Sequence, residues 1–386
     1  MIMVFLNQAD AIGTILWFLV FFIFMFLYPR LMLSQSIYKM EQSAEKLEEM
    51  SRRANMMVVR KSKRHDVKAK IDAFTEFFVI EPSSLDPFGI VRKIDQTIRS
   101  METRFSEFVD EIGSGLSSKE KEELNYGLRA AIGLKQLSKI VRHYVELTKK
   151  FKNWQLAMIL NMQLPIIEKI AESEYKGTEA FVNGWPIGDA IGAAVAASFM
   201  ENPKPIAEDI VYDVVNIEGR KCFFLKANGP EPSLGRIDEA LEAVMKKNKI
   251  SRVVTIDAAQ KLEGEKSGAV AEGVGFAMGG IGQREIIENV LLPKKIPTDS
   301  IVIKVGLTEA ILPLKKEIYN ALPQARESVI RNVKRAKKDQ KVIVIGIGNS
   351  CGVGNSKKSL DETKKVVEML DKKEKEQQQR QKKGWF

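Results

Sequence analysis

One apolar run near the N-terminus constrains this chain of 386 residues more than any other feature. Between Ala11 and Leu27 the chain carries no charged residue and reads AIGTILWFLVFFIFMFL. The apolar core of a bilayer is ~30 Å thick and takes about 20 apolar residues in a helix. The run extends to Leu33, and Tyr28 stands near its end, where interfacial aromatic residues gather. We therefore predict a transmembrane anchor over residues 1–33, with residues 11–33 in the lipid bilayer.

The flanking residues favour an uncleaved anchor over a signal peptide. No Lys or Arg precedes the run, and residues 31–34 (LMLS) form no cleavage site of small residues. Basic residues follow it instead, beginning with Arg30, Lys39 and Lys46. Because the side rich in Lys and Arg stays in the cytoplasm, we predict a single-pass protein of the cell membrane with its N-terminus outside and the bulk of the chain cytoplasmic. Two cysteines are too few for a disulfide framework, which agrees with this location.

The net charge of +10 is concentrated in blocks, of which the most basic covers residues 52–70. A basic block next to a membrane binds anionic lipid headgroups, at about 1 kcal/mol per residue near the surface. Nucleic acid is the rival partner for such a block. A solvated charged surface is the third interpretation, and the sequence leaves all three open.

Residues 34–172 have the pattern of a helical zone. Apolar residues recur at spacings of three and four, as at Ile94, Ile98, Met101 and Phe105. The glycines of residues 113–115 interrupt this pattern, and Ser117 with Glu120 then forms a capping-box motif that begins another helix. We therefore predict a helical hairpin or coiled coil that turns at residues 113–115, and a homo-oligomer that forms through this zone.

Residues 173–358 change to short β-branched runs that alternate with helical patterns, which predicts an α/β domain. The predicted strands are Lys221–Lys226, Arg252–Ile256, Ser300–Val305 and Lys341–Ile345. Helices are predicted over Ile237–Lys247 and from Thr308 to about Lys337, where Pro313 and Pro323 would kink or split the second one. This alternation predicts a three-layer α/β/α domain with a mainly parallel sheet. Residues 359–386 form a charged C-terminal helix and tail.

Ligands of parallel α/β sheets bind past the carboxyl ends of the strands, and four glycine-containing loops fall at such places. They cover residues 184–192, 227–236, 257–273 and 346–355. Backbone N–H groups of such turns hold anions, although turns that need positive φ explain the glycines as well. The residues predicted to bind a small or anionic ligand are Gly188, Lys226, Gly229, Gly235, Lys261, Glu265, Lys266, Gly346, Gly348, Asn349 and Ser350.

The fourth loop lacks the motifs of the common nucleotide sites. Cys351 occupies the position of the third glycine in a dinucleotide fingerprint, and no Gly-Lys-Ser/Thr of a P-loop is present. Both histidines, His65 and His143, fall in the helical zone. We therefore predict no cofactor, no metal site and no histidine-based triad.

Two aspartates form the most specific constellation. Asp189 lies in the segment GDAIG at a predicted helix start, and Asp257 follows a predicted strand in TIDAAQ. Two neighbouring carboxylates share a proton because both cannot ionise together, so one activates water while the other supplies a proton. In the alternative interpretation Asp189 caps a helix and Asp257 holds a loop by hydrogen bonds.

These segments carry two resemblances. The N-terminal anchor, the helical stretch, GDAIG, IDAAQKLEGEKSGAVAEGVGFAMGG and the final GIGNS resemble an uncharacterised archaeal membrane-anchored family, the domain of unknown function number fifteen-twelve. This resemblance covers nearly the full chain and implies no activity.

The second resemblance is local. GDAIG, then Lys226 at a strand end, then Ile256-Asp257-Ala258 is similar in order to the fold of the hydrogenase-maturation peptidases and the spore-germination protease. That resemblance implies a three-layer α/β/α domain with Asp189 and Asp257 as catalytic acids. In that family the glycine turn precedes the first acid, whereas residues 346–349 follow both acids here. No His matches the nickel ligand of such peptidases.

Two classes of function follow from these patterns. The first is a membrane-anchored cytosolic α/β protein that binds a small or anionic ligand in its glycine-rich loops. The alternative is a membrane-tethered, peptidase-like hydrolase that uses Asp189 and Asp257 as a paired-aspartate site.

Overall fold

The computed structural model describes residues 2–80, 89–277 and 283–383, and these divide into two compact units. The helical unit comprises residues 1–52 and 134–171, and the α/β unit comprises residues 53–133 and 172–386. The last three residues of the predicted C-terminal tail and residues 278–280 of the FAMGG segment lie outside the described residues.

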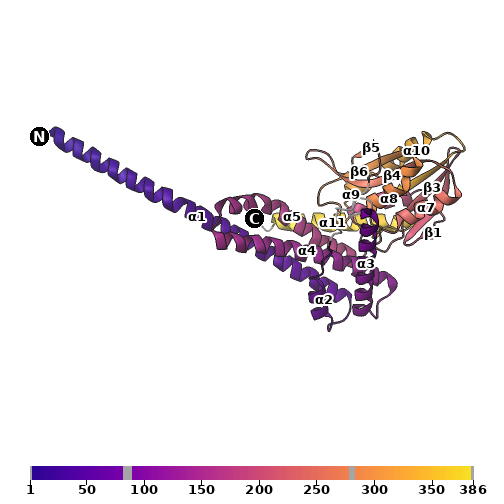
Figure 1. Cartoon of the computed structure of the whole chain (residues 1–386), viewed down its shortest axis with the longest axis horizontal. Coiled ribbons are helices and arrows are strands. Elements are labelled where there is room, and N and C mark those ends of the chain that lie inside the picture. The colour runs from indigo at the N-terminus through magenta and orange to yellow at the C-terminus, as the bar shows by residue number, and fades with distance from the viewer. Residues whose placement is uncertain (1, 81–88, 278–282, 384–386) are drawn as a thin grey trace. The chain divides into compact units, whose positions relative to one another are not determined.

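The predicted apolar helix is present and is longer than the anchor alone. Helix α1 runs from Ile2 to Lys61 with Pro29 inside it (Figure 1). Within the described residues, this is the one helix that is long and apolar enough to cross a membrane. Its large apolar side chains from Ile15 to Tyr28 are exposed. The span and the following polar segment therefore form one continuous helix rather than two elements separated near residue 33.

The helical unit consists of three helical segments, and each segment buries one apolar stripe. The polar part of α1 contributes Met40, Ala44 and Leu47, which are fully buried. The second half of α4 (Ser118–Phe151) and the first half of α5 (Trp154–Val182) supply the opposing stripes. Their buried residues recur at helical spacing, at Val141, Val145 and Thr148 of α4 and, seven positions apart, at Ala157 and Leu164 of α5.

The predicted helical turn at residues 113–115 is confirmed. In the α/β unit, helix α3 covers Ile90–Ile112, and α4 begins at Ser118. The capping box forms as predicted, because the backbone N–H of Ser117 donates to Glu120 Oε2 at 2.9 Å and the Glu120 N–H donates to Ser117 Oγ at 3.3 Å. The short helix α2 (Lys68–Phe74) joins this part of the unit through stacked Phe74 and Phe108 rings, 3.8 Å between centroids.

A mixed sheet of seven described strands forms the middle layer of the α/β unit, in the order β1-β2-β3-β7-β4-β6-β5 (Figure 1). The four predicted strands fall within its parallel centre, formed by β3, β7, β4 and β6. The outer strands pair antiparallel. The strand bounds are β1 Lys204–Ala207, β2 Ile210–Ile217, β3 Arg220–Ala227, β4 Ile250–Gln260, β5 Val270–Val274, β6 Thr298–Val305 and β7 Lys341–Gly346.

Helices cover both faces of this sheet, so the three-layer prediction is confirmed. One face carries α7 (Ile237–Lys247) and α8 (Gln283–Leu291), which pack on strand residues such as Phe223 and Ile343. The other face carries α6 (Ile191–Ala197), α9 (Lys316–Tyr319), α10 (Leu322–Lys334) and Val367 of α11 (Leu360–Lys383). Short 3-10 turns lie at η1 (Gly188–Ala190), η2 (Leu292–Lys294) and η3 (Lys357–Ser359).

The two prolines divide the helix predicted from Thr308 to Lys337. Residues 308–315 form no helix, and Pro313 makes a β-bridge with Ile187 instead. Pro323 lies in the first turn of α10, where its missing N–H is not needed. The loop that results, residues 306–315, lies against the segment that holds Asp189.

Candidate functional site

The carboxyl ends of three adjacent strands bring the predicted loops together. Strand β7 lies between β3 and β4, and all three run in parallel. The loop after β7 (residues 346–355) therefore lies between the loop after β3 (residues 227–236) and the end of β4. At this edge Ile347 extends the pairing, since its N–H donates to the carbonyl of Ile256 at 2.8 Å.

Asp189 lies in η1 and is held from two sides. Its backbone N–H donates to the carbonyl of Ala310 at 2.8 Å, in the loop after β6. Its carboxylate Oδ2 accepts the backbone N–H of Asn349 at 2.7 Å, in the loop after β7. Neither η1 nor α6 has a side-chain cap, so the alternative interpretation of Asp189 as a helix cap is not supported.

The environment of Asp189 favours its protonated form. The residue is half-buried, and burial raises the pKa of its carboxyl above the ordinary value, although the N–H of Asn349 acts in the opposite direction. Gly348 makes this contact possible. Its φ is +111°, and a Cβ there would come within 2.0 Å of the Asp189 carbonyl oxygen.

Asp257 lies at the same edge of the sheet. It directly follows Ile256 in β4 and is 5% exposed, and its Oδ1 accepts the N–H of Ala258 at 2.7 Å. Ile256 and Asp189 contact the same short turn, at Ile347 and Asn349 respectively. Asp189 and the residue before Asp257 therefore contact one turn of chain. Ile256 and Ala258 pack on the α6 side of the sheet, so the Asp257 side chain between them points to the other side, and it is the more deeply buried of the two acids.

Lys226, at the end of β3, is fully buried and forms part of a polar network. Its Nζ donates to Asn355 Oδ1 at 2.7 Å and to the Ala227 carbonyl at 2.6 Å. Burial lowers the pKa of Lys226 to about 7, and the negative charge of Glu231 opposes this effect. Asn355 Nδ2 donates to Asn228 Oδ1 at 2.7 Å, so the network joins the loops after β3 and β7.

The loop after β7 already uses most of its backbone donors within the protein. The N–H groups of residues 347 and 349–353 donate to protein acceptors. Ser350 is fully buried, and its Oγ donates to the Asn228 carbonyl at 2.5 Å. In this state the loop offers few N–H groups to an anion.

The predicted glycines serve close packing between segments. A Cβ on Gly188 would meet the Glu309 carbonyl oxygen at 2.0 Å, and one on Gly229 would meet the Val353 carbonyl oxygen at 2.2 Å. A Cβ on Gly346 would likewise meet the carbonyl oxygen of Gly192 in α6 at 2.5 Å. Gly235 has φ +62°, and a Cβ on it would meet the Asp209 carbonyl oxygen at 2.4 Å. Of the two interpretations of these glycines, the geometry favours the structural turn.

The charged residues predicted in the loop after β4 have separate surroundings. Glu265 forms an ion pair with Lys304 of β6 and accepts the N–H of Leu262 at 2.8 Å. Lys261 is half-buried, and its backbone N–H donates to Val305 at 2.8 Å. Lys266 is exposed. None of these contacts joins them to Asp189 or Asp257.

Two residues that support this edge, Asn355 and Glu309, could not be found from a sequence motif. Asn355 stands in a glycine-rich loop without any distinguishing motif. Glu309 accepts hydrogen bonds from Ser267 Oγ and the Gly306 N–H, both at 2.6 Å, and from Lys315 Nζ at 2.8 Å. Although burial acts to raise it, these bonds lower the pKa of Glu309 to about 2. Glu309 thereby fixes the loop that accepts the Asp189 N–H.

Cysteine and metal chemistry find no support among the residues that the structure describes. Burial raises the pKa of the Cys351 thiol, so a thiolate nucleophile is disfavoured there. Across those residues, no group of three His, Cys, Asp or Glu side chains is placed to hold a metal ion.

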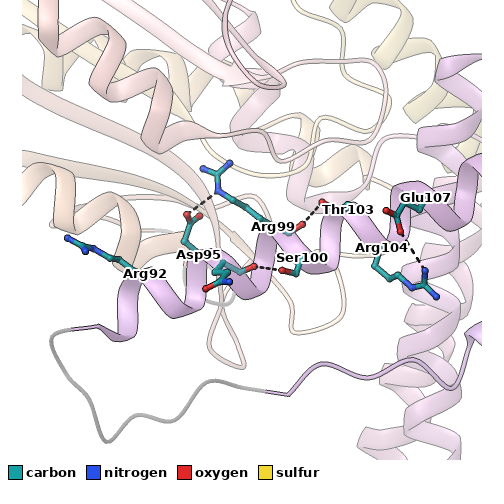
Figure 2. Close-up of a pocket in the computed structure, with 8 residues that line it drawn as sticks. Arg92, Asp95, Arg99, Ser100, Thr103, Arg104 and Glu107 are labelled. Carbon is teal, nitrogen blue, oxygen red and sulfur yellow. Dashed lines mark hydrogen bonds and ion pairs between the residues drawn. The ribbon is translucent and has the colours of Figure 1, made fainter.

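A separate groove of about 500 Å³ follows α3 and contains none of the predicted site residues. Figure 2 shows Asp95 and Arg99 pointing toward one another along this helix. Asp95 pairs with Arg99 at 3.1 Å, and Arg99 pairs with Glu239 at 2.9 Å. Because these charges neutralise one another, the groove offers a ligand less than the edge at Asp189 does.

The basic block is also largely neutralised by its own surroundings. Within the α/β unit, Lys63 pairs with Glu120 at 2.5 Å and Lys68 with Asp72 at 3.0 Å. Further side chains of the block form ion pairs, namely Lys61, Arg64 and Lys70.

The fold defines a class: an α/β domain, with Asp189 and Asp257 at the carboxyl edge of its parallel strands, preceded by a helical region with one candidate membrane span among the described residues. Residues 14–184 match the N-terminal domain of a family described as protein of unknown function (DUF1512), and residues 187–354 match the C-terminal domain of the same family. The chain belongs to this family. Neither the curated proteins nor the solved structures contain a match to it.

Proposed function

We propose that this chain is a membrane-anchored protein whose α/β unit binds a small polar ligand at the edge formed by Asp189 and Asp257. Residues 11–33 lie in the lipid bilayer of the cell membrane, the N-terminus is outside, and the bulk of the chain is cytoplasmic. The observation that carries the ligand site is the shared turn: Asn349 binds the Asp189 carboxylate, and Ile347 binds the residue before Asp257.

The chemistry of this edge indicates what the ligand offers. Because the loop after β7 has used most of its N–H groups, recognition falls to the acids rather than to a glycine-rich anion cradle. A carboxyl with a raised pKa, as at Asp189, donates a hydrogen bond when it is protonated. The ligand therefore presents an oxygen acceptor, such as a carbonyl, hydroxyl or phosphate oxygen, next to Asp189.

The test is a ligand search with the full chain in detergent micelles. The thermal midpoint is measured against a panel of inorganic phosphate, nucleotides, organic acids and short peptides. A ligand that binds the folded state raises the midpoint by mass action. We expect Asp189→Asn to weaken binding at least tenfold and the matched exposed variant Glu263→Gln to bind as the wild type does. A panel without any hit, or equal affinities in both variants, would contradict the proposal.

A second candidate is a peptidase-like hydrolase, and the raised pKa of Asp189 favours it because a protonated carboxyl can act as a general acid. Asp257 as the carboxylate takes a proton from water, whose oxygen adds to the substrate carbonyl. Asp189 in its protonated form gives its proton to the leaving amine. The turn at residues 347–349 contacts the Asp189 carboxylate and the backbone of the residue before Asp257, so both acids belong to the same edge of the sheet.

Turnover separates this candidate from binding alone. A mixed peptide library is incubated with the full chain, and cleavage is followed by mass spectrometry. The hydrolase predicts cleavage that Asp257→Asn and Asp189→Asn each abolish without loss of folding. Cleavage that survives in either variant, or no cleavage by the wild type, would reject the hydrolase.

We also propose two kinds of partner predicted from the sequence: anionic lipid or nucleic acid at the basic block, and further copies of the chain at the helical zone. Anionic lipid or nucleic acid at residues 52–70 requires that the ion pairs of the block open, so vesicle flotation and nucleic-acid binding are measured against salt. Oligomer formation through the helical zone is tested by the mass of the full chain in micelles.

A further inference from the structure

The first half of α5 carries an unusual surface. From Trp154 to Ile167 the helix has no charged residue. One stripe of it is buried in the helical unit at Ala157 and Leu164. Five large apolar side chains of this segment are exposed to between 43% and 68%, namely Trp154, Met158, Ile159, Met162 and Ile166. Helices of soluble units normally present a polar face outward, so this surface needs a partner.

Contacts within the helical unit define which residues of α1 lie beside this surface of α5. Asn161 Nδ2 donates to the Ser36 carbonyl at 3.5 Å, and Ser43 Oγ donates to Glu168 at 2.6 Å. Both contacts join residues 125 positions apart. An equal separation at two points seven residues apart means that α1 and α5 run parallel and keep the same level.

That register places the start of α5 where α1 leaves the proposed membrane span. Trp154 lies at the level of Pro29, and Ile159 lies at the level of Ser34, one residue beyond the apolar run. At 1.5 Å per residue, Met162 lies only about 6 Å beyond Leu33, and Ile166 lies about 12 Å beyond it. The polar headgroup region of a bilayer occupies roughly this interval outside the apolar core.

The side chains around the tip have the composition of an interfacial segment. Phe151 ends α4 and is 63% exposed, and Trp154 begins α5. Exposed Lys150 and Lys152 flank Phe151. Aromatic rings with adjacent lysines gather at the boundary between lipid tails and headgroups, and anionic headgroups attract the lysines.

We infer that the α4–α5 tip, residues 150–162, lies in the headgroup region of the same leaflet from which α1 emerges. This inference rests on the proposed membrane anchor. The chain would then hold the bilayer at two places, by a span and by an interfacial hairpin. The second contact fixes the tilt and rotation of the helical unit, which a single span leaves free.

The occupant of this surface is a lipid bilayer rather than a second copy of the chain, because the exposed stripe coincides in level with the end of the span. A dimer interface would have no reason to stop at that level. The exposed stripe ends at Ile166, and Glu168, which follows, pairs with Lys46 at 2.8 Å on the polar side.

The experiment uses spin labels on single cysteines in the full chain, reconstituted in vesicles of phosphatidylcholine and phosphatidylglycerol. Ile159→Cys reports the proposed interfacial surface, and Val20→Cys reports the span. Glu45→Cys, an exposed α1 position beyond the membrane, is the matched control. The unmodified chain is the labelling control, since Cys222 and Cys351 are buried. Accessibility to oxygen, which enters lipid, is compared with accessibility to a water-soluble nickel chelate.

We expect labels at Val20 and Ile159 to favour oxygen and the label at Glu45 to favour nickel. If Ile159 behaves as Glu45 does while Val20 stays in lipid, the interfacial hairpin is wrong and the anchor stands. If Val20 is open to nickel, the anchor itself fails and the hairpin fails with it. Shielding of Ile159 from both reagents, with disulfide cross-links between Ile159→Cys copies, would assign the surface to a dimer.

Discussion

Asp189 is a half-buried residue whose carboxyl lies in surroundings that resist its ionisation. Its place at the same sheet edge as Asp257 could be predicted because a residue at a strand end and a residue at a helix start meet at one edge of a parallel sheet. Its hydrogen bond to Asn349 could not, because that contact depends on how the loop after β7 folds back across a gap of 160 residues.

The first prediction concerns the pH dependence that Asp189 gives the folded state. A raised pKa means that the folded chain binds more protons than the unfolded chain between the ordinary pKa and the raised one. The stability of the wild type therefore falls as the pH rises through that window. Asp189→Asn keeps an oxygen for the Asn349 N–H but does not titrate. Between pH 4 and 8, the thermal midpoint of the variant should rise relative to that of the wild type as the pH rises. Parallel curves would refute the raised pKa, and the exposed variant Glu263→Gln is the matched control.

The second prediction concerns Lys226. With a pKa lowered to about 7 in the folded state, its unfolded form binds the extra proton between pH 7 and the ordinary pKa near 10.5. The stability of the wild type should rise with pH in this window, by up to about 1.4 kcal/mol per pH unit. Lys226→Met abolishes the rise and also leaves the Ala227 carbonyl without its donor. Chemical unfolding at pH 7 and pH 9.5 measures the difference, and an unchanged gap between the two proteins would show that Lys226 stays charged.

Helix α6 is the element whose position in the fold most restricts its residue types. It is a short, fully buried helix of small residues that lies against the carboxyl ends of β4 and β7. Gly192 is its closest point of approach, since a Cβ there would meet the Ile347 carbonyl oxygen at 2.2 Å and that of Ile256 at 2.5 Å. This close packing puts η1, and Asp189 with it, against the two strand ends.

The third prediction follows from that contact. Gly192→Ala forces α6 away from the sheet, because the obstructing atoms are backbone and cannot rotate aside. We expect a loss of about 3 kcal/mol or more in the free energy of unfolding, at the upper end of the usual cost of overpacking, together with loss of ligand binding. Gly115→Ala is the matched control, since nothing lies within 4 Å of its added Cβ. Denaturant unfolding of both variants provides the measurement, and equal midpoints would contradict the tight approach.

Elements with a strong apolar pattern were predictable, and those without one were not. The four central strands are buried on both faces, so their continuous apolar runs identify them. Strand β5 (Val270–Val274) is largely exposed and contains Gly273, so its residues carry no such signal. The extent of α1 was also missed, because a helix shows no break where its surface changes from apolar to polar. For α5, the sequence shows an uncharged stretch, but only the contacts with α1 give its level.

At the scale of the whole molecule, the sequence anticipated the order of an apolar helix, a helical region and an α/β domain. It did not anticipate that α1, α4 and α5 each run through the boundary between the two units. Long helices that continue through a boundary leave no linker of Pro, Gly or Ser to mark it. The family match instead separates its two domains at residues 184–187, directly before η1.

The last prediction concerns the orientation of the chain in the membrane. Arg30 follows the uncharged core at Leu27, Lys39 lies beyond Leu33, and no basic residue precedes the core, so the charge bias retains the C-terminal side in the cytoplasm. Protease added to sealed right-side-out vesicles should leave the α/β unit intact, whereas protease added to inverted vesicles should digest it. Replacing Arg30 and Lys39 by Gln, with Lys introduced at positions 7 and 8, reverses the bias and should expose a fraction of the chains outside. If the wild-type unit is digested in right-side-out vesicles, the acidic edge faces the exterior, and its ligand must be sought there.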